Sequence, residues 1–129
     1  MLKMRILAIG AHPDDIEIFM FGLLKKLKIR GDHISLAIVT DGCQGGNIPK
    51  KDLVKIRKKE AISGLHELGK PYFLNLPDGK LGENLNHKQR VRSLINKIKP
   101  DLIITHDKDD YHSDHKILSK IVSEIAGHY

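Results

Sequence analysis

The alternation of short apolar runs with longer amphipathic segments is the feature that most constrains the fold of this 129-residue chain. Four runs rich in β-branched or other apolar residues have the length of strands, at 5–9, 34–40, 72–76 and 102–105. Each is separated from the next by more than the dozen residues that a parallel crossover needs. The runs look buried on both faces, which is typical of parallel strands. The sequence therefore predicts a parallel sheet built from βα units.

The segments between these runs have the period of one-sided helices. We expect helices over 16–29, ended by Gly31, over 53–68, ended by Gly69, before Pro100, and over 114–125. The positions expected to face the core are Ile16, Met20, Leu23, Leu24 and Leu27 in the first helix, Ile56, Ile62, Leu65 and Leu68 in the second, and Val91, Leu94, Ile95 and Ile98 in the third. This pattern predicts an α/β fold: a three-layer, Rossmann-like parallel sheet of order 3-2-1-4 with helices on both faces.

Composition excludes several classes of protein. With 40% apolar and 29% charged residues the chain is an ordinary globular protein, and we expect a single domain over residues 1–129. The one cysteine, Cys43, cannot close an intrachain disulfide, which favours a cytoplasmic location. The apolar N-terminal stretch is too short to span a membrane. The net charge of +6 is spread over several expected helices and aromatic residues make up 5%, so we do not expect a nucleic-acid partner.

Two groups of metal-ligand residues follow the first and the fourth expected strands. Residues 11–15 read Ala-His-Pro-Asp-Asp, and residues 112–115 read His-Ser-Asp-His. In parallel α/β sheets, ligands bind at the carboxyl edge of the strands, where the strand order switches. The order 3-2-1-4 places the first strand beside the fourth, so both groups should converge at this edge.

Acidic residues at a helix start can be simple caps, which is the alternative explanation for Asp14 and Asp15. The convergence of two such groups favours a metal site instead. Two imidazoles and one carboxylate with open positions form either a catalytic zinc site or a facial-triad iron site. Such a metal lowers the pKa of a coordinated water to about 7 and yields hydroxide for hydrolysis. The remaining carboxylate of the pair then serves as general base.

At these residues the sequence resembles the zinc-dependent N-acetylglucosaminyl-conjugate deacetylases of the PIG-L/LmbE type. The signature Ala-His-Pro-Asp-Asp-x-Glu of that family appears at 11–17, and its His-x-Asp-His signature at 112–115. Further similarities occur at 40–42, 57–61, 76–79 and 100–101. The resemblance covers nearly the whole chain and looks strongest for the subgroup of bacillithiol-type glucosaminyl malate deacetylases.

The resemblance implies a function and a role for each site residue. The chain would remove an N-acetyl group from an N-acetylglucosamine-type sugar conjugate, a small-molecule substrate, through a metal-bound hydroxide. Zinc is the implied metal, with ferrous iron as the alternative. The implied zinc ligands are His12, Asp15 and His115. Asp14 would be the general base, and His112 would stabilise the oxyanion or protonate the leaving amine. Asp114 would orient His112, and Arg57 would lie near the substrate.

Two features depart from the family pattern. Ser113 replaces the proline usual in the His-Pro-Asp-His turn, which removes no ligand. Family members also continue beyond the fourth helix into further strands, whereas this sequence ends at Tyr129. We therefore expect an exposed edge beside the fourth strand that invites pairing with a second copy, giving a homo-oligomer.

Other interpretations remain open at this point. The chain could be a metal-dependent hydrolase of another amide or of a phosphoester, or an inactive metal-binding fragment. The glycine-rich loop 41–47 lacks P-loop spacing and either cradles a phosphate or lines the pocket. His106 is either a surface residue or a support for the metal ligands. Four further histidines have no ligand-spaced companion and are expected at the surface: His33, His66, His87 and His128.

Overall fold

The computed structural model of the protein describes residues 2–44 and 47–127. In this part of the chain, strands and helices alternate. The strands are β1 (Arg5–Gly10), β2 (His33–Thr40), β3 (Tyr72–Leu76) and β4 (Leu102–Ile104). The helices are α1 (Asp15–Phe19), α2 (Phe21–Arg30), α3 (Lys50–Gly64), α4 (Leu85–Ile98) and α5 (Ser113–Ala126).

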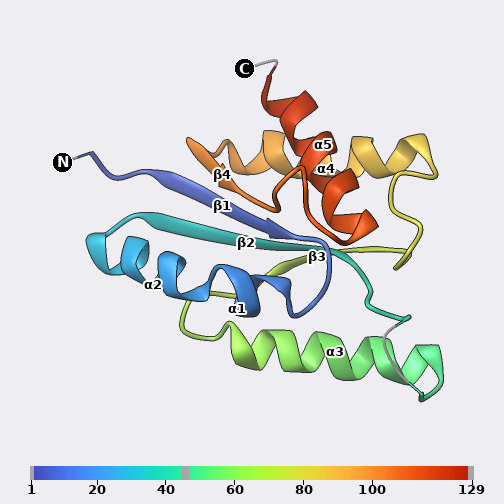
Figure 1. Ribbon diagram of the computed structural model, residues 1–129. Coiled ribbons are helices and arrows are strands. Elements are labelled where there is room, and N and C mark those ends of the chain that lie inside the picture. The colour runs from blue at the N-terminus through green and yellow to red at the C-terminus, as the bar shows by residue number, and fades with distance from the viewer. Residues whose placement is uncertain (1, 45–46, 128–129) are drawn as a thin grey trace.

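The strands form one sheet of order β3-β2-β1-β4, in which all neighbouring strands are parallel. β1 pairs with β2 from Arg5 opposite His33 to Gly10 opposite Ile38. Its pairing with β4 is shorter and runs from Ile6 to Ala8. The predicted strand order is therefore confirmed, and the carboxyl ends of β1 and β4 lie side by side (Figure 1).

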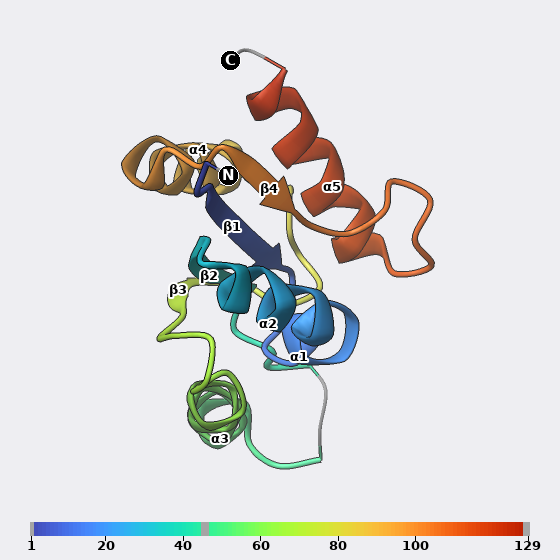
Figure 2. The ribbon, with the colours of Figure 1, turned by 90° about the vertical axis from the view of Figure 1, so that its left-hand side faces the viewer.

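Helices cover both faces of the sheet. Figures 1 and 2 show α1, α2 and α3 on one face and α4 and α5 on the other. Successive residues of β1 alternate between the two apolar layers: Ile6 and Ala8 join the layer under α1 to α3, whereas Leu7 and Ile9 join the layer under α4 and α5. All four side chains are fully buried. This arrangement confirms the predicted three-layer fold and explains why the strand sequence shows no polar face.

The predicted helix over 16–29 is wrong in one respect, because it consists of two helices. α1 ends at Phe19, and Met20 has φ −128° and ψ −13°, outside the helical region. Met20 itself is buried, as are Ile16 and Leu24, whereas Leu23 is exposed. The apolar period continues across the break through Ile16, Met20 and Leu24, so it could not locate the break.

The second helix also differs from its prediction. α3 begins at Lys50 and ends at Gly64, and a turn covers the residues up to Leu68. Ile56 and Ile62 are 45% and 40% exposed, so they do not face the core as expected. The buried positions include Ala61, Leu65 and Leu68. Ala61 joins the apolar layer on this face of the sheet, where Ile56 and Ile62 were expected.

One expected surface histidine is buried. His87 is 7% exposed, and its Nδ1 accepts a hydrogen bond from the backbone N–H of Gly82. It therefore stabilises the turn before α4. His33 and His66 are exposed as expected, and His128 lies outside the described residues.

Helix α4 offers a test of local stability. Its N-cap residue, Asn84, accepts a hydrogen bond from the backbone N–H of Asn86 through its side chain, at 2.9 Å. We expect Asn84→Ala to lower the free energy of unfolding by about 1 kcal/mol, because this N–H loses its partner. Urea unfolding measures the change, with Asn86→Ala in the same turn as the control. Equal losses in both variants would contradict a capping role.

The outer side of β4 forms the edge of the sheet. A groove of about 1160 Å³ runs along it between α4 and α5. Ile95, Ile103 and Val122 are among the residues lining this groove, and His106 lies at its wall.

In the described part of the chain, no helix has both the length and the apolar character needed to cross a membrane.

Candidate functional site

The loops that follow β1 and β4 meet at the carboxyl edge of the sheet. Two threonine side chains fix the end of β1 there. The Thr105 hydroxyl donates to the carbonyl of Ile9 at 2.8 Å, and the Thr40 hydroxyl donates to the carbonyl of Ala11 at 2.7 Å. The backbone of Ala11, directly before His12, is therefore tied to β2, its neighbour on one side.

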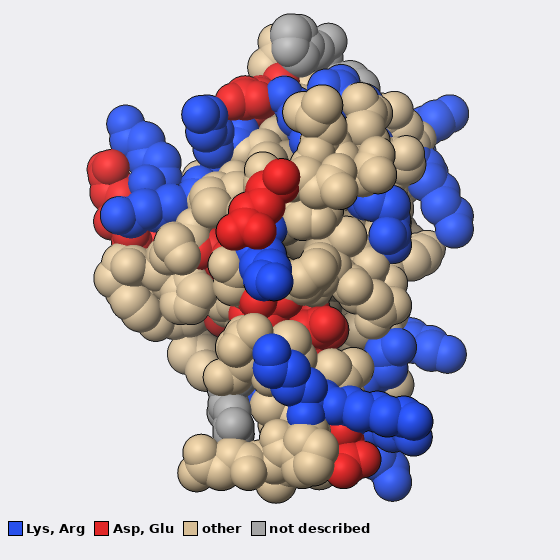
Figure 3. Space-filling model, turned by 90° about the vertical axis from the view of Figure 1, so that its right-hand side faces the viewer, with Lys and Arg blue, Asp and Glu red and all other residues tan. Residues whose placement is uncertain are grey.

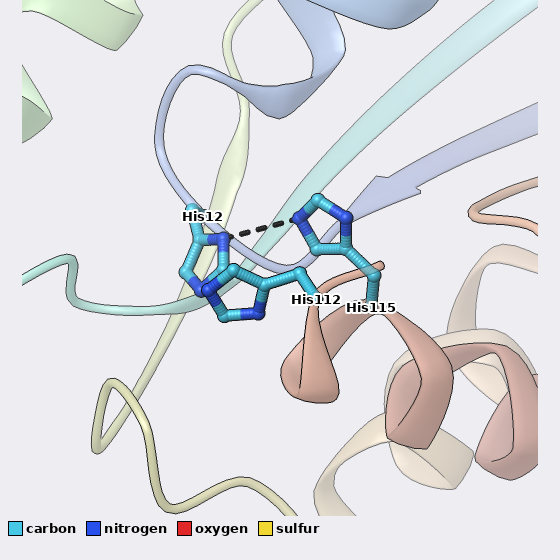
Figure 4. A group of neighbouring side chains, drawn as sticks. All are labelled: His12, His112 and His115. Carbon is cyan, nitrogen blue, oxygen red and sulfur yellow. Dashed lines mark hydrogen bonds between the residues drawn. The ribbon is translucent and has the colours of Figure 1, made fainter. Parts of the chain in front are cut away.

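The three residues expected to bind a metal lie together. His12 comes from the loop after β1, Asp15 from the start of α1, and His115 from the first turn of α5. Oδ2 of Asp15 lies 3.2 Å from Nδ1 of His12 and 3.0 Å from Nε2 of His115. The two imidazole nitrogens are 3.3 Å apart (Figure 4). Three potential donor atoms thus converge on one point.

Their spacing suits a tetrahedral ion. Zinc takes nitrogen and oxygen ligands at about 2.0–2.2 Å, so its tetrahedral donor atoms lie roughly 3.3 Å apart. The observed separations of 3.0, 3.2 and 3.3 Å are close to this value. Asp15 and His115 are buried and His12 is nearly so, which keeps the donor atoms in place. The residues present therefore fit a cation with three protein ligands.

A second layer of carboxylates surrounds His12. Its Nε2–H donates to Oδ2 of Asp114 at 2.9 Å, and Oδ1 of Asp78 lies 3.2 Å from the same nitrogen. Oδ2 of Asp114 also accepts a hydrogen bond from the backbone N–H of Gly79. Such contacts fix the ring of a ligand histidine and leave its other nitrogen, Nδ1, to face a metal.

These contacts change the pKa values of the groups involved. Burial lowers the pKa of His12, but hydrogen bonds to Asp114, Asp15 and Asp78 outweigh it and raise the pKa to about 11. Burial raises the pKa of Asp15, but its close contacts with the imidazoles of His106 and His12 outweigh burial and hold the pKa below its ordinary value. Without a cation, a proton on His12 balances the surrounding carboxylates.

His112 is both the N-cap of α5 and a neighbour of His12. Its Nδ1 accepts a hydrogen bond from the backbone N–H of Asp114 at 3.1 Å. The neutral ring therefore carries its proton on Nε2. The ring centroids of His112 and His12 are 4.5 Å apart, so the His112 ring lies against a proposed ligand (Figure 4), and one ring nitrogen from each of His12, His112 and His115 lies within 4.8 Å of the others.

Asp114 does not contact its expected partner through its carboxylate. The sequence places it beside His112, but its side-chain hydrogen bonds go to His12 and Gly79, and only its backbone N–H reaches His112. The side chain at the second helical position of α5 is directed inward, where it is 1% exposed. Its contacts therefore support a different residue from the one expected.

A small cavity opens beside this cluster. It has a volume of about 290 Å³ and is lined by Asp14, Arg57, Asp78 and His112, among others. Asp14 is exposed, unlike the buried Asp15 next to it. Arg57 reaches the cavity from α3 along Gly42, where φ is +69° and a Cβ atom would lie 2.7 Å from Cδ of the arginine. Gly42 therefore allows the arginine to approach the site.

The glycine-rich loop lines the same cavity through Gly42 and Gln44, whereas Gly45 and Gly46 lie outside the described residues. Cys43 is half-buried in this loop, and burial raises the pKa of its thiol. A raised pKa disfavours the thiolate, so this cysteine is not set up as a nucleophile.

Sequence reasoning missed two carboxylates of the site. Asp78 follows β3 and contacts His12, and Oδ1 of Asp110 lies 3.0 Å from Nδ1 of His115. Asp110 follows β4, the neighbour of β1, which is a signal that could have identified it, whereas Asp78 follows the more distant β3. Seen from this edge, acidic side chains run across the middle of the surface, with Lys and Arg on both sides (Figure 3).

The fold and the site together define a class: Rossmann-like α/β proteins with a histidine and carboxylate cluster at the carboxyl edge of the sheet. Residues 7–126 match the family described as PIG-L: GlcNAc-PI de-N-acetylase. The match covers most of the chain, and the chain belongs to this family. The family expected from the two signatures is thereby confirmed.

Three similar proteins support this membership. Diacetylchitobiose deacetylase of Thermococcus kodakarensis is 28% identical over 120 residues, which cover 87% of this chain and 45% of that protein. The uncharacterized deacetylase YaiS of Escherichia coli K12 is 33% identical over 118 residues, which cover 85% of this chain and 61% of YaiS. One similar structure is N,N'-diacetylchitobiose deacetylase from Pyrococcus horikoshii, complexed with its inhibitor MPG. It has a TM-score of 0.88 and 28% sequence identity to this chain, and the superposition covers 95% of this chain and 49% of that protein. The chain thus spans about half the length of these relatives.

Proposed function

We propose that this chain is a zinc-dependent N-deacetylase that acts on an N-acetylglucosamine-type amino sugar. The observation that carries the proposal is the convergence of His12, Asp15 and His115, whose donor atoms lie 3.0–3.3 Å apart, beside a cavity lined by further polar groups. Membership of the PIG-L family supports the reaction class. The diacetylchitobiose deacetylases among the similar proteins support an amino-sugar substrate.

His12, Asp15 and His115 are the proposed ligands of the ion. A bound zinc ion supplies Lewis acidity, which polarises the acetamide carbonyl and makes water acidic enough to react near neutral pH. Two imidazoles and a carboxylate also suit ferrous iron, so the metal content of the purified protein decides between the two. Asp114 and Asp78 keep the Nδ1 of His12 turned toward the ion through their contacts with Nε2.

Asp14 and His112 are the proposed catalytic residues. The carboxylate of Asp14 lines the cavity and takes the proton of the attacking water as general base. His112 lines the same cavity, and its Nε2–H donates to the carbonyl oxygen as negative charge develops on it. The proton held by Asp14 then passes to the amine as the C–N bond breaks and acetate leaves.

Arg57 is the proposed substrate-binding residue. Its guanidinium group enters a cavity of about 290 Å³, at the lower end of the volumes of small-molecule sites. Two carboxylates, Asp14 and Asp78, line the same cavity. They offset the positive charges of Arg57 and of a bound cation, so the charge of the site is compatible with a neutral acetamide.

This chain matches only part of the length of its relatives, which favours a second candidate function, that of an inactive metal-binding fragment. The matched regions span 45% and 61% of two relatives, and the remaining residues could complete the substrate pocket. Metal binding depends on residues 12–115, all of which the chain contains, whereas turnover requires the whole pocket.

An acetate assay separates these candidates. We expect the zinc-loaded chain to release acetate from at least one of a panel of N-acetylated sugars that includes N,N'-diacetylchitobiose and N-acetylglucosaminyl malate. Elemental analysis of the same sample gives the metal bound per chain, and p-nitrophenyl phosphate serves as the phosphoester control. Full zinc occupancy without acetate release from any member of the panel would favour the inactive fragment. Hydrolysis of the phosphoester alone would contradict the deacetylase assignment.

A further inference from the structure

His106 connects the two loops that carry the proposed ligands. It follows β4 by two residues and its side chain is almost fully buried, 2% exposed. Its Nε2 accepts a hydrogen bond from the backbone N–H of Ala11 at 3.0 Å. The same nitrogen lies 3.3 Å from Oδ2 of Asp15. One buried side chain therefore contacts both the residue before His12 and a second proposed ligand.

The hydrogen bond to Ala11 determines what His106 can do. An imidazole nitrogen that accepts a hydrogen bond carries no proton and uses its single lone pair for that bond. Nε2 of His106 therefore has no lone pair left for a cation, although its distance to Asp15 and His115 would allow it to be a fourth ligand. A fourth protein ligand would complete a tetrahedral shell and close the position that catalysis needs.

The ring of His106 also supports His115. The two imidazoles are stacked with centroids 3.7 Å apart and an angle of 3° between their planes. Phe19 meets both rings edge-on, with centroid distances of 6.4 Å to His106 and 6.1 Å to His115. The stacking limits the orientation of His115, whose Nε2 points at Asp15. It also places His106 as the wall between the proposed metal position and the groove along β4.

We propose that His106 is a positioning residue of the metal centre and is not a ligand. Through the N–H of Ala11 it fixes the loop that carries His12, and through its flat face it fixes the ring of His115. This role leaves three protein ligands and an open coordination position. The proposal rests on the proposed function, because it assumes that His12, Asp15 and His115 hold the ion.

Two substitutions separate the effect of the hydrogen bond that Nε2 of His106 accepts from the effect of the stacked imidazole ring. His106→Phe keeps an aromatic face and removes the acceptor, whereas His106→Gln keeps an acceptor near the position of Nε2 and removes the ring. We expect His106→Phe to weaken zinc binding about 10- to 100-fold, measured by competition with a chromophoric chelator. His106→Gln should bind zinc more tightly than His106→Phe. His66→Phe, an exposed histidine on the turn after α3, is the control and should bind as the parent chain does.

Cobalt substitution tests the ligand set directly. The visible absorption of bound Co²⁺ reports the number and type of its ligands, so we expect the parent chain and His106→Gln to give the same spectrum. A changed spectrum in His106→Gln would make His106 a ligand and overturn the proposal. So would a zinc affinity of folded His106→Phe equal to that of the parent chain, or equal losses in the Phe and Gln variants.

Circular dichroism establishes that each variant is folded, and if His106→Phe is not, the cobalt spectrum of His106→Gln decides. A parent chain that binds no zinc would overturn the proposed function together with this inference. Zinc binding by the parent chain with an unaffected His106→Phe would overturn this inference alone.

Discussion

Replacing Asp14 with asparagine is expected to leave zinc binding intact and to reduce acetate release about a hundred- to ten-thousandfold. The reason is the different position of the two adjacent aspartates. Asp15 is buried with its Oδ2 within 3.2 Å of the donor nitrogens of His12 and His115. Asp14 is exposed and lines the cavity instead. An amide at position 14 cannot take a proton from water, but the three proposed ligands are unchanged.

His12→Ala should lose both zinc and activity, because it removes one of the ligands themselves. Zinc per chain by elemental analysis and acetate release are measured on the same preparations. Asp52→Asn, an exposed aspartate in the first turn of α3, is the control for a change of charge away from the site. Equal loss of zinc in Asp14→Asn and His12→Ala would contradict the proposed division of roles between Asp14 and Asp15.

The sequence was sufficient to predict where the candidate site lies. The parallel arrangement of the strands follows from the crossover lengths and the buried character of β1, whereas the order 3-2-1-4 rested on the expectation of a Rossmann-like sheet. Once β1 and β4 are neighbours, the residues following them must meet, which is why His12 and His115 were brought together correctly. This reasoning needs no side-chain detail, because it depends only on which strand ends share an edge.

The contacts of individual side chains could not be predicted in the same way. β3 is separated from β1 by β2, so the edge rule gave no reason to place Asp78 against His12. The loop after β3 crosses this distance, and the N–H of Gly79 helps to hold it by donating to Asp114. The direction of the Asp114 side chain depends on how α5 packs on the sheet. The break at Met20 could not be located either, because the apolar period continues across it, although Gly22 stands two residues further on.

The stability of the metal-free protein should depend strongly on His12. Its ring nitrogens lie 2.9 Å from Asp114, 3.2 Å from Asp15 and 3.2 Å from Asp78. Since the pKa of His12 is raised from 6.5 to about 11, the ring is protonated at neutral pH when no metal is bound. We expect His12→Ala to lower the free energy of unfolding by about 3–5 kcal/mol in the presence of a chelator, because buried carboxylates lose their counter-charge.

A double-mutant cycle with Asp114→Asn isolates this charge effect from the loss of packing. In the parent chain, Asp114→Asn removes a partner of His12 and is destabilising. In the His12→Ala background it relieves repulsion between Asp114 and its acidic neighbours, so it should be less destabilising by about 0.5–3 kcal/mol. Asp109→Asn, an exposed residue of the loop before α5, is the matched control. Identical effects of Asp114→Asn in both backgrounds would show that His12 does not balance Asp114.

The dependence of this effect on pH has a definite sign. A raised pKa in the folded state means that the protonated ring contributes its full stabilisation below pH 6.5 and loses it as the pH rises toward about 11. Urea unfolding of the metal-free parent chain and of His12→Ala at about pH 6 and about pH 10 should therefore show a smaller difference at the higher pH. A difference that grows with pH would mean that the neutral ring, rather than the imidazolium, is the form that the three carboxylates stabilise.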